Sequence, residues 1–132
     1  MREILFRGKR TDDGKWMCGN LTVWSDGSVS IDRAPTASSP MYAVIPETVG
    51  QYTGLTDKNG KKIFEGDIVN VNTNKDTLCH RYEGRNLVIR YDEYHRFVAS
   101  GRLEYPLCNH YEWEVIGNIH DNPELLEVGN NA

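Results

Sequence analysis

Apolar and polar residues alternate in short runs along this chain, and each run ends at a group of turn-forming residues. Such alternation predicts β-strands, because successive side chains of a strand point to opposite faces. Helical periodicity is confined to Asn122–Glu127, where a capping residue precedes a proline and an acid. The pattern therefore predicts a mainly β protein that ends in a short helical turn. The predicted strands cover residues 3–9, 15–24, 29–31, 41–45, 68–71, 86–91, 97–100 and 111–116.

Glycines and prolines mark the connections between these strands. Gly19 lies inside a predicted strand, where a β-bulge would suit it. Residues 33–40, RAPTASSP, form the best linker candidate. In the last strand, Trp113 and Val115 share one face while Glu114 and Ile116 share the other, so we expect Trp113 to be buried in the core.

The length and composition suit a globular protein of one domain, with room for a small subdomain. The chain has 132 residues, of which 39% are hydrophobic and 26% charged. No apolar run approaches the roughly 20 residues of a membrane span, and the N-terminus has no signal-peptide pattern. Three cysteines without CxxC spacing disfavour a disulfide framework. We therefore expect a cytoplasmic protein.

Residues 51–71, QYTGLTDKNGKKIFEGDIVNV, superficially suggest a phosphate or calcium site. The phosphate loop requires Gly-Lys-Ser/Thr followed by a helix, whereas Lys62 follows Lys61 here and a strand comes next. The calcium-loop spacing also fails, because lysines occupy ligand positions. We interpret the segment as structural turns that use four residues: Asn59, Gly60, Gly66 and Asp67.

Four residues offer a metal-site alternative, namely Cys79, His80, Cys108 and His110. On a strand Cys79 and His80 would point to opposite faces, and the paired spacing of zinc ligands is missing. Buried cysteines that act as small apolar side chains are the favoured interpretation. The histidines lack any nucleophile motif around them. We expect no enzymatic activity and no cofactor.

The net charge of −4 disfavours a general nucleic-acid binder, which usually carries a basic excess. A local basic and aromatic patch remains a second hypothesis, because aromatic rings can stack on bases beside arginines. Its members are Arg81, Arg85, Arg90, Tyr91, Tyr94 and Arg96. Aromatic residues on strands also serve as core or cross-strand pairs, which is the structural alternative.

Three blocks of the sequence carry a resemblance to a known family, namely EILFRGKRTDDGKWMCGNL, ETVGQYTGLTDKNGKKIFEGDIV and YEWEVIGNIHDNPELLE. They resemble the YopX family of proteins encoded by bacteriophages and prophages. The resemblance implies an SH3-like barrel from about Thr48 onward and an N-terminal β-meander subdomain. We accordingly predict domains at residues 1–46 and 47–132. The resemblance implies no catalytic residues and no cofactor.

These observations favour a non-enzymatic interaction module that self-associates in the cytoplasm of a bacterial host cell. A host or phage protein is an alternative partner, and a nucleic acid is the runner-up. The hypothesis rests on the many short strands, whose edges can pair with another chain, and on the Pro/Ser-rich loop.

Overall fold

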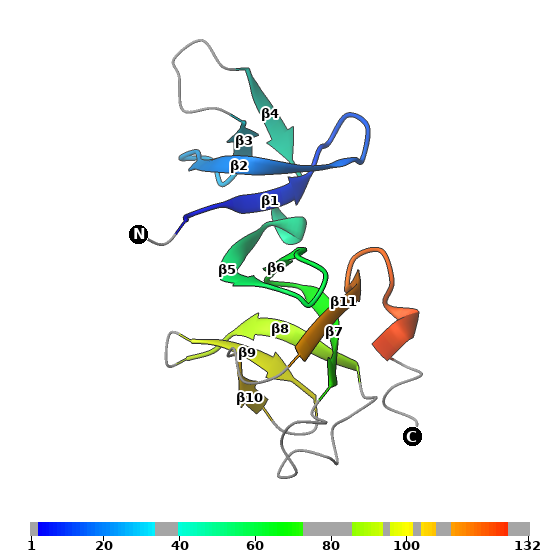
Figure 1. Ribbon diagram of the computed structural model, residues 1–132. Coiled ribbons are helices and arrows are strands. Elements are labelled where there is room, and N and C mark those ends of the chain that lie inside the picture. Colours follow the sequence, from blue (N-terminus) through cyan, green and yellow to red (C-terminus); the bar gives the residue numbers. More distant parts are fainter. Residues whose placement is uncertain are drawn as a thin grey trace. The chain divides into compact units, whose positions relative to one another are not determined.

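The computed structural model describes residues 3–33, 40–72, 86–93, 96–101, 104–107 and 112–126 (Figure 1). Nearly all regular structure in these residues is antiparallel β-sheet, so the prediction of a mainly β protein is confirmed. The elements are β1 (Phe6–Lys9), β2 (Trp16–Val23), β3 (Val29–Asp32), β4 (Met41–Val44), the 3-10 helix η1 (Pro46–Thr48), β5 (Gly50–Thr56), β6 (Lys62–Phe64), β7 (Asp67–Asn72), β8 (Asn86–Tyr91), β9 (Phe97–Ser100), β10 (Glu104–Pro106) and β11 (Glu112–Asn118).

The strands form two sheets. The first has the order β4-β3-β2-β1-β5-β6, and the second has the order β10-β9-β8-β7-β11. Strand β5 passes from the first of two compact units, Met1–Gly54, to the second, Leu55–Ala132. Each unit has its own hydrophobic cluster. The prediction of separate domains at residues 1–46 and 47–132 stays a prediction.

The first unit is a meander of β1 to β4, in which each strand pairs with the next along the chain. Its inner face buries Met17, Val29, Ile31 and Val44. These residues are the buried ones because successive side chains of a strand point to opposite faces, so their neighbours in each strand lie on the other face. The tight turns at Gly14 and Gly27 have φ of 72° and 91°, which glycine adopts without steric cost.

Gly19 is needed for a different reason from the predicted bulge. It pairs in register with Phe6, and no register shift interrupts β2 there. A Cβ at this position would lie 1.8 Å from the carbonyl oxygen of Asp32. The glycine thus permits two strands to approach closely at the point where β2 stops pairing with β1 and begins to pair with β3.

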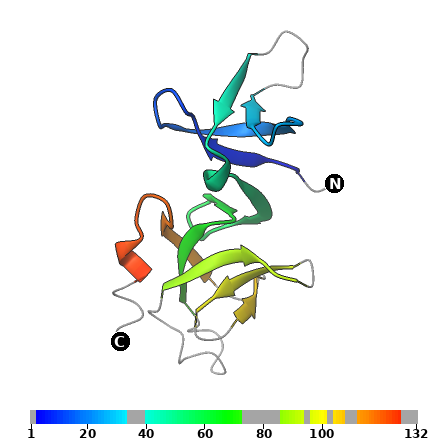
Figure 2. The same ribbon diagram turned by 180° about the vertical axis from the view of Figure 1, so that it is seen from behind.

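The second unit encloses one core between strands of both sheets. Figure 2 shows β7, β8 and β9 as adjacent, twisted strands. Trp113 is 3% exposed, in keeping with its predicted place on an inner face. The buried cluster consists of Ile63, Val69, Val71, Leu87, Ile89, Ala99 and Trp113.

A β-bulge does occur in β11, at Ile116. The register with β7 shifts between Val115 and Gly117, so Ile116 is the extra residue of a β-bulge and is 38% exposed. After β11 the chain turns through hydrogen bonds from Asn122 N–H to the Asn118 carbonyl and into a helical turn at residues 124–126. The predicted helical turn is therefore present, and its last residue, Glu127, lies outside the described residues.

Candidate interaction surface and the Asp57 clasp

The first candidate site is the outer face of β4 and its neighbours in the first unit. Met41 and Ala43 point away from the core, and Ile45 continues the alternation because its backbone is extended. Trp24 lies on the same face, where its indole Nε1–H donates to Ser30 Oγ at 3.1 Å. We call Trp24, Met41, Ala43 and Ile45 the β4 surface.

The large apolar side chains of the β4 surface are accessible to solvent. Trp24 is 46%, Met41 42% and Ile45 36% exposed. On the same face Ala43 stands beside Ser30, which stands beside Thr22 in register. Met41 stands beside Asp32, which stands beside Asn20. The face is thus apolar along β4 and is flanked on β3 by the hydroxyl group of Ser30 and the carboxylate of Asp32. An apolar strip with a polar rim suits contact with another macromolecule.

The turn between β1 and β2 hydrogen bonds to the outer edge of β4. Thr11 N–H donates to the Ala43 carbonyl at 3.0 Å, and Ile45 N–H donates to the Lys9 carbonyl at 2.8 Å. Arg10 forms an antiparallel bridge with Val44 between these two bonds. The β4 edge is therefore already paired from residue 43 to residue 45. Addition of another strand along that edge, one basis of the sequence-based hypothesis, is blocked there.

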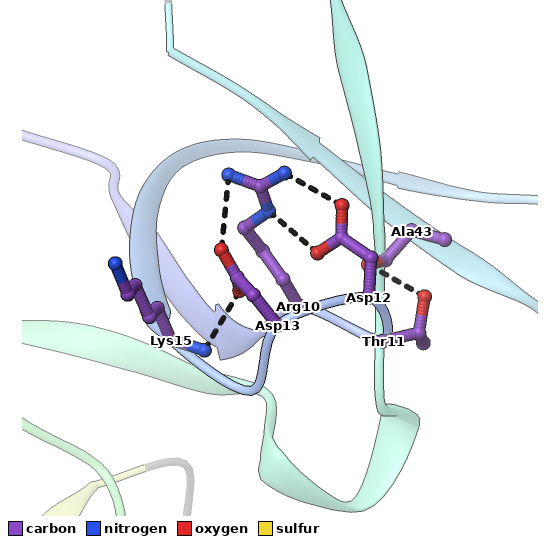
Figure 3. A network of polar contacts seen from close by, with 6 residues as sticks. All are labelled: Arg10, Thr11, Asp12, Asp13, Lys15 and Ala43. Atoms are coloured by element: carbon purple, nitrogen blue, oxygen red, sulfur yellow. Dashed lines mark hydrogen bonds and ion pairs between the residues drawn. The ribbon is translucent and has the colours of Figure 1, made fainter.

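Arg10 holds this turn in shape (Figure 3). Its Nε and Nη2 donate to the two carboxylate oxygens of Asp12 at 2.9 and 2.6 Å, and its Nη1 lies 3.5 Å from Asp13 Oδ2. The hydrogen bond from Arg10 lowers the pKa of Asp12. The guanidinium also stacks 4.2 Å from the ring centroid of Tyr42. Because these groups already satisfy one another, we interpret the network as structural support for β4.

The second candidate site contains the predicted turn residues Asn59 and Gly60. Gly60 N–H donates to the Asp57 carbonyl at 3.0 Å, and Asp57 N–H donates to the Lys61 carbonyl at 2.7 Å. Gly60 has φ of 82°. This is the pattern of a type I turn followed by a glycine bulge, so Asn59 and Gly60 occupy the last two turn positions instead of the central two.

The carboxylate of Asp57 joins this turn to β11. Its Oδ1 accepts hydrogen bonds from the backbone N–H groups of Asn59 and Lys61, each at 2.9 Å. Its Oδ2 accepts one from Val115 N–H at 3.0 Å. We call these three bonds the Asp57 clasp. Lys58 N–H strengthens the same connection by donating to the Trp113 carbonyl at 2.9 Å.

The environment of Asp57 favours the charged carboxylate. The side chain is 6% exposed, and this burial alone raises its pKa. The hydrogen bonds from Val115, Lys61 and Asn59 act in the opposite sense and are aided by the positive charge of Lys61. The net result is a lowered pKa, so the carboxylate stays ionised as an acceptor of three N–H groups.

The other predicted turn residues, Gly66 and Asp67, lie where β6 passes into β7. Asp67 is 1% exposed, and its Oδ2 accepts a hydrogen bond from Phe64 N–H at 2.8 Å. Gly66 has φ of 91°. Its N–H donates to the Ile89 carbonyl at 2.8 Å, and its carbonyl accepts from Ile119 N–H at 2.9 Å. This turn therefore connects β8 with the end of β11.

The predicted nucleic-acid patch lies only in part within the described residues, and it stays a prediction. Arg90 and Tyr91 follow one another in β8, so their side chains point to opposite faces. Arg96 forms an ion pair with Asp92 at 3.0 Å. Tyr91 is 46% exposed and packs edge-on against Phe97, with ring centroids 4.9 Å apart. The remaining members, Arg81, Arg85 and Tyr94, lie outside the described residues.

The proposed metal alternative falls entirely on residues of which the structure says nothing, namely Cys79, His80, Cys108 and His110. In the part of the chain that is described, no three His, Cys, Asp or Glu side chains form a group that could hold a metal ion. No helix within that part is long and apolar enough to cross a membrane.

Sequence reasoning missed both the β4 surface and the long-range bond of the Asp57 clasp. The only local signal for the β4 surface was that Met41, Ala43 and Ile45 alternate along one face of a strand. In so short a strand, alternation alone does not tell which face is exposed. The bond between Asp57 and Val115 had none, because it joins residues 58 positions apart. Only the three-dimensional fold brings these groups together.

Comparison with known proteins supports the fold and the family. Protein EF1440 from Enterococcus faecalis, whose crystal structure is known, is 28% identical in sequence, with a TM-score of 0.57. The match covers 96% of this chain and 99% of that one. Comparison with curated proteins gives no match. A family model described as YopX protein matches residues 5–127, which include both candidate sites and all of the three sequence blocks except Glu3 and Ile4, and the chain therefore belongs to the YopX family.

Proposed function

We propose that this protein is a non-enzymatic interaction module that self-associates through the β4 surface. The observation that carries the proposal is the exposure of Trp24, Met41 and Ile45 on one face of the first unit. Covering apolar side chains of this size removes them from water, which favours association. Because the edge of β4 is already hydrogen bonded to the β1–β2 turn, association would use the outer face of the strand and not its edge.

The supporting network strengthens this proposal. Arg10, Asp12 and Tyr42 fix the turn that hydrogen bonds to β4, so the β4 surface is held in one shape before any partner binds. A surface that is ordered in advance loses less conformational entropy on binding. The polar groups of the Asp57 clasp are engaged in stabilising the fold and are not free for chemistry on a substrate.

The test is sedimentation velocity on the purified protein across a wide concentration range. We expect a concentration-dependent oligomer that Met41→Glu converts to monomer. Val23→Glu is the matched control. Val23 is 67% exposed, but its side chain points to the opposite face of β2 from Thr22 and therefore lies away from the β4 surface. A wild-type monomer at every concentration, or oligomers unaffected by Met41→Glu, would show that the self-association proposal is wrong.

We further propose that the second unit is an SH3-like barrel. Strands β6, β7, β8 and β11 contribute to one core, and the Asp57 clasp joins the β5–β6 turn to β11. Such a connection between the beginning and the end of a small β unit favours a closed arrangement. Nuclear Overhauser contacts between the Lys58 and Val115 amides would support closure in solution, and their absence would contradict it.

A nucleic-acid-binding module is the second candidate, favoured by the exposed ring of Tyr91. Fluorescence anisotropy at low salt with labelled single- and double-stranded DNA and RNA is the appropriate test, since the electrostatic contribution is then strongest. Binding that Tyr91→Ala weakens would support this function, whereas no binding at low salt would remove it.

We place the protein in the cytoplasm of a bacterial cell carrying the phage or prophage that encodes it.

A further inference from the structure

The Asn59–Gly60 step carries a chemical liability that the proposed function does not use. It is the only Asn-Gly pair in the sequence, and both residues are exposed. In a flexible chain the backbone nitrogen of the glycine loses its proton and attacks the side-chain Cγ of the asparagine. The Cγ–Nδ2 bond breaks, ammonia leaves and a cyclic succinimide forms. Water then opens either carbonyl of the ring to give aspartate or isoaspartate.

The folded turn opposes the first step of this reaction. The attacking nitrogen belongs to Gly60, whose N–H donates to the Asp57 carbonyl at 3.0 Å. The N–H of Asn59 is held by Asp57 Oδ1 at 2.9 Å. Both peptide units flanking Asn59 are therefore fixed by a single residue, and the Gly60 nitrogen cannot rotate toward the side chain of Asn59 without breaking its bond.

The attachment of Asp57 to β11 makes this restraint part of the fold. Its carboxylate also binds Lys61 N–H and Val115 N–H, and its side chain is buried. Opening the turn therefore requires loss of bonds to a core strand and not only fraying of an exposed loop. We propose that Asn59–Gly60 is a site of spontaneous deamidation that the Asp57 clasp holds closed in the folded protein.

The reaction products would weaken the clasp in turn. Isoaspartate at position 59 adds a methylene group to the main chain, so the N–H groups of residues 59 and 61 no longer fit around one carboxylate oxygen. Aspartate at position 59 adds a second negative charge two residues from the buried carboxylate of Asp57, whose Oδ1 accepts a bond from the residue-59 N–H. Deamidation is thus a modification that, once it occurs, makes the connection between this turn and β11 less stable.

The test compares deamidation in the wild-type protein, in Asp57→Ala and in a free peptide of residues 55–63. Each is incubated at mildly alkaline pH, and the asparagine and its products are quantified by peptide mapping and mass spectrometry. We expect the wild-type protein to react more slowly than the peptide by roughly tenfold or more, and Asp57→Ala to approach the peptide rate. Asp26→Ala is the matched control, because Asp26 accepts bonds from Ser28 in a turn of the first unit. It should leave the rate unchanged.

Two results would overturn the proposal: a wild-type rate equal to that of the peptide, or a folded Asp57→Ala protein that reacts as slowly as the wild type. If Asp57→Ala does not fold, hydrogen exchange of the Gly60 amide in the wild type decides the question. Protection of that amide by a factor similar to the slowing of deamidation would support the proposal. An unprotected Gly60 amide beside slow deamidation would refute it.

Discussion

Asp57 and Val115 are 58 residues apart in the sequence, and the carboxylate of the first accepts a 3.0 Å hydrogen bond from the backbone of the second. Asp57 lies in the block ETVGQYTGLTDKNGKKIFEGDIV, and Val115 lies in the block YEWEVIGNIHDNPELLE. Two of the three segments that identify the family are thus joined by one buried side chain. This relationship gives those segments a physical role in stabilising the second unit.

Replacement of Asp57 by asparagine should separate the long-range bond from the local turn. The amide oxygen can still accept from Asn59 and Lys61, but the amide nitrogen would then face Val115 N–H, donor against donor. We expect a loss of about 1–3 kcal/mol in the free energy of unfolding, measured by urea denaturation. Asp57→Ala should cost more, because it removes all three bonds. Equal stability of Asp57→Asn and the wild type would show that the bond to Val115 is dispensable.

The contribution of Asp57 to stability should depend on pH. Its pKa is lowered in the folded protein, so the stabilisation is complete above the unfolded value of about 3.9 and is lost as pH falls through the lower folded value. The difference in unfolding free energy between the wild type and Asp57→Asn should therefore be constant near neutral pH and shrink in acid. Urea titrations at a series of pH values measure it. A difference that persists unchanged to the acid limit of folding would contradict the assigned ionisation.

Local features of the fold were predictable, because they depend on neighbouring residues. Alternation and turn residues located the strands of the meander, and Gly60 and Gly66 lie in turns with positive φ. The wider arrangement was not accessible in this way. Pairing of β1 with β5 and of the β1–β2 turn with β4 depends on long-range contacts, and a bulge was expected at Gly19 but occurs at Ile116.

Gly60 should tolerate substitution according to how well the new residue adopts a positive φ. Its φ is 82°, and among the described residues no atom beyond Gly60 and its two chain neighbours lies within 4 Å of the position that a Cβ would occupy, so backbone strain determines the cost. We expect Gly60→Val to lower the unfolding free energy by about 1 kcal/mol or more, and Gly60→Asn to lower it by less, since asparagine tolerates this conformation. Thermal denaturation of both variants measures the difference. Identical melting temperatures for Gly60→Val and the wild type would mean that the turn is built differently.

Gly19 should be far less tolerant, for a steric reason that differs from that at Gly60. A Cβ there would lie 1.8 Å from the Asp32 carbonyl oxygen and 2.7 Å from its carbon, which are backbone atoms that cannot rotate away. Gly19→Ala must therefore separate β2 from β3, and we expect a loss of about 3 kcal/mol or more, as large as removal of a core side chain. Cys18→Ala is the matched control, because the exposed side chain of Cys18 lies next to Gly19 in the same strand. Far-ultraviolet circular dichroism with urea denaturation would test the contrast, and similar stabilities for the two variants would show that the first unit is more deformable than its strand register implies.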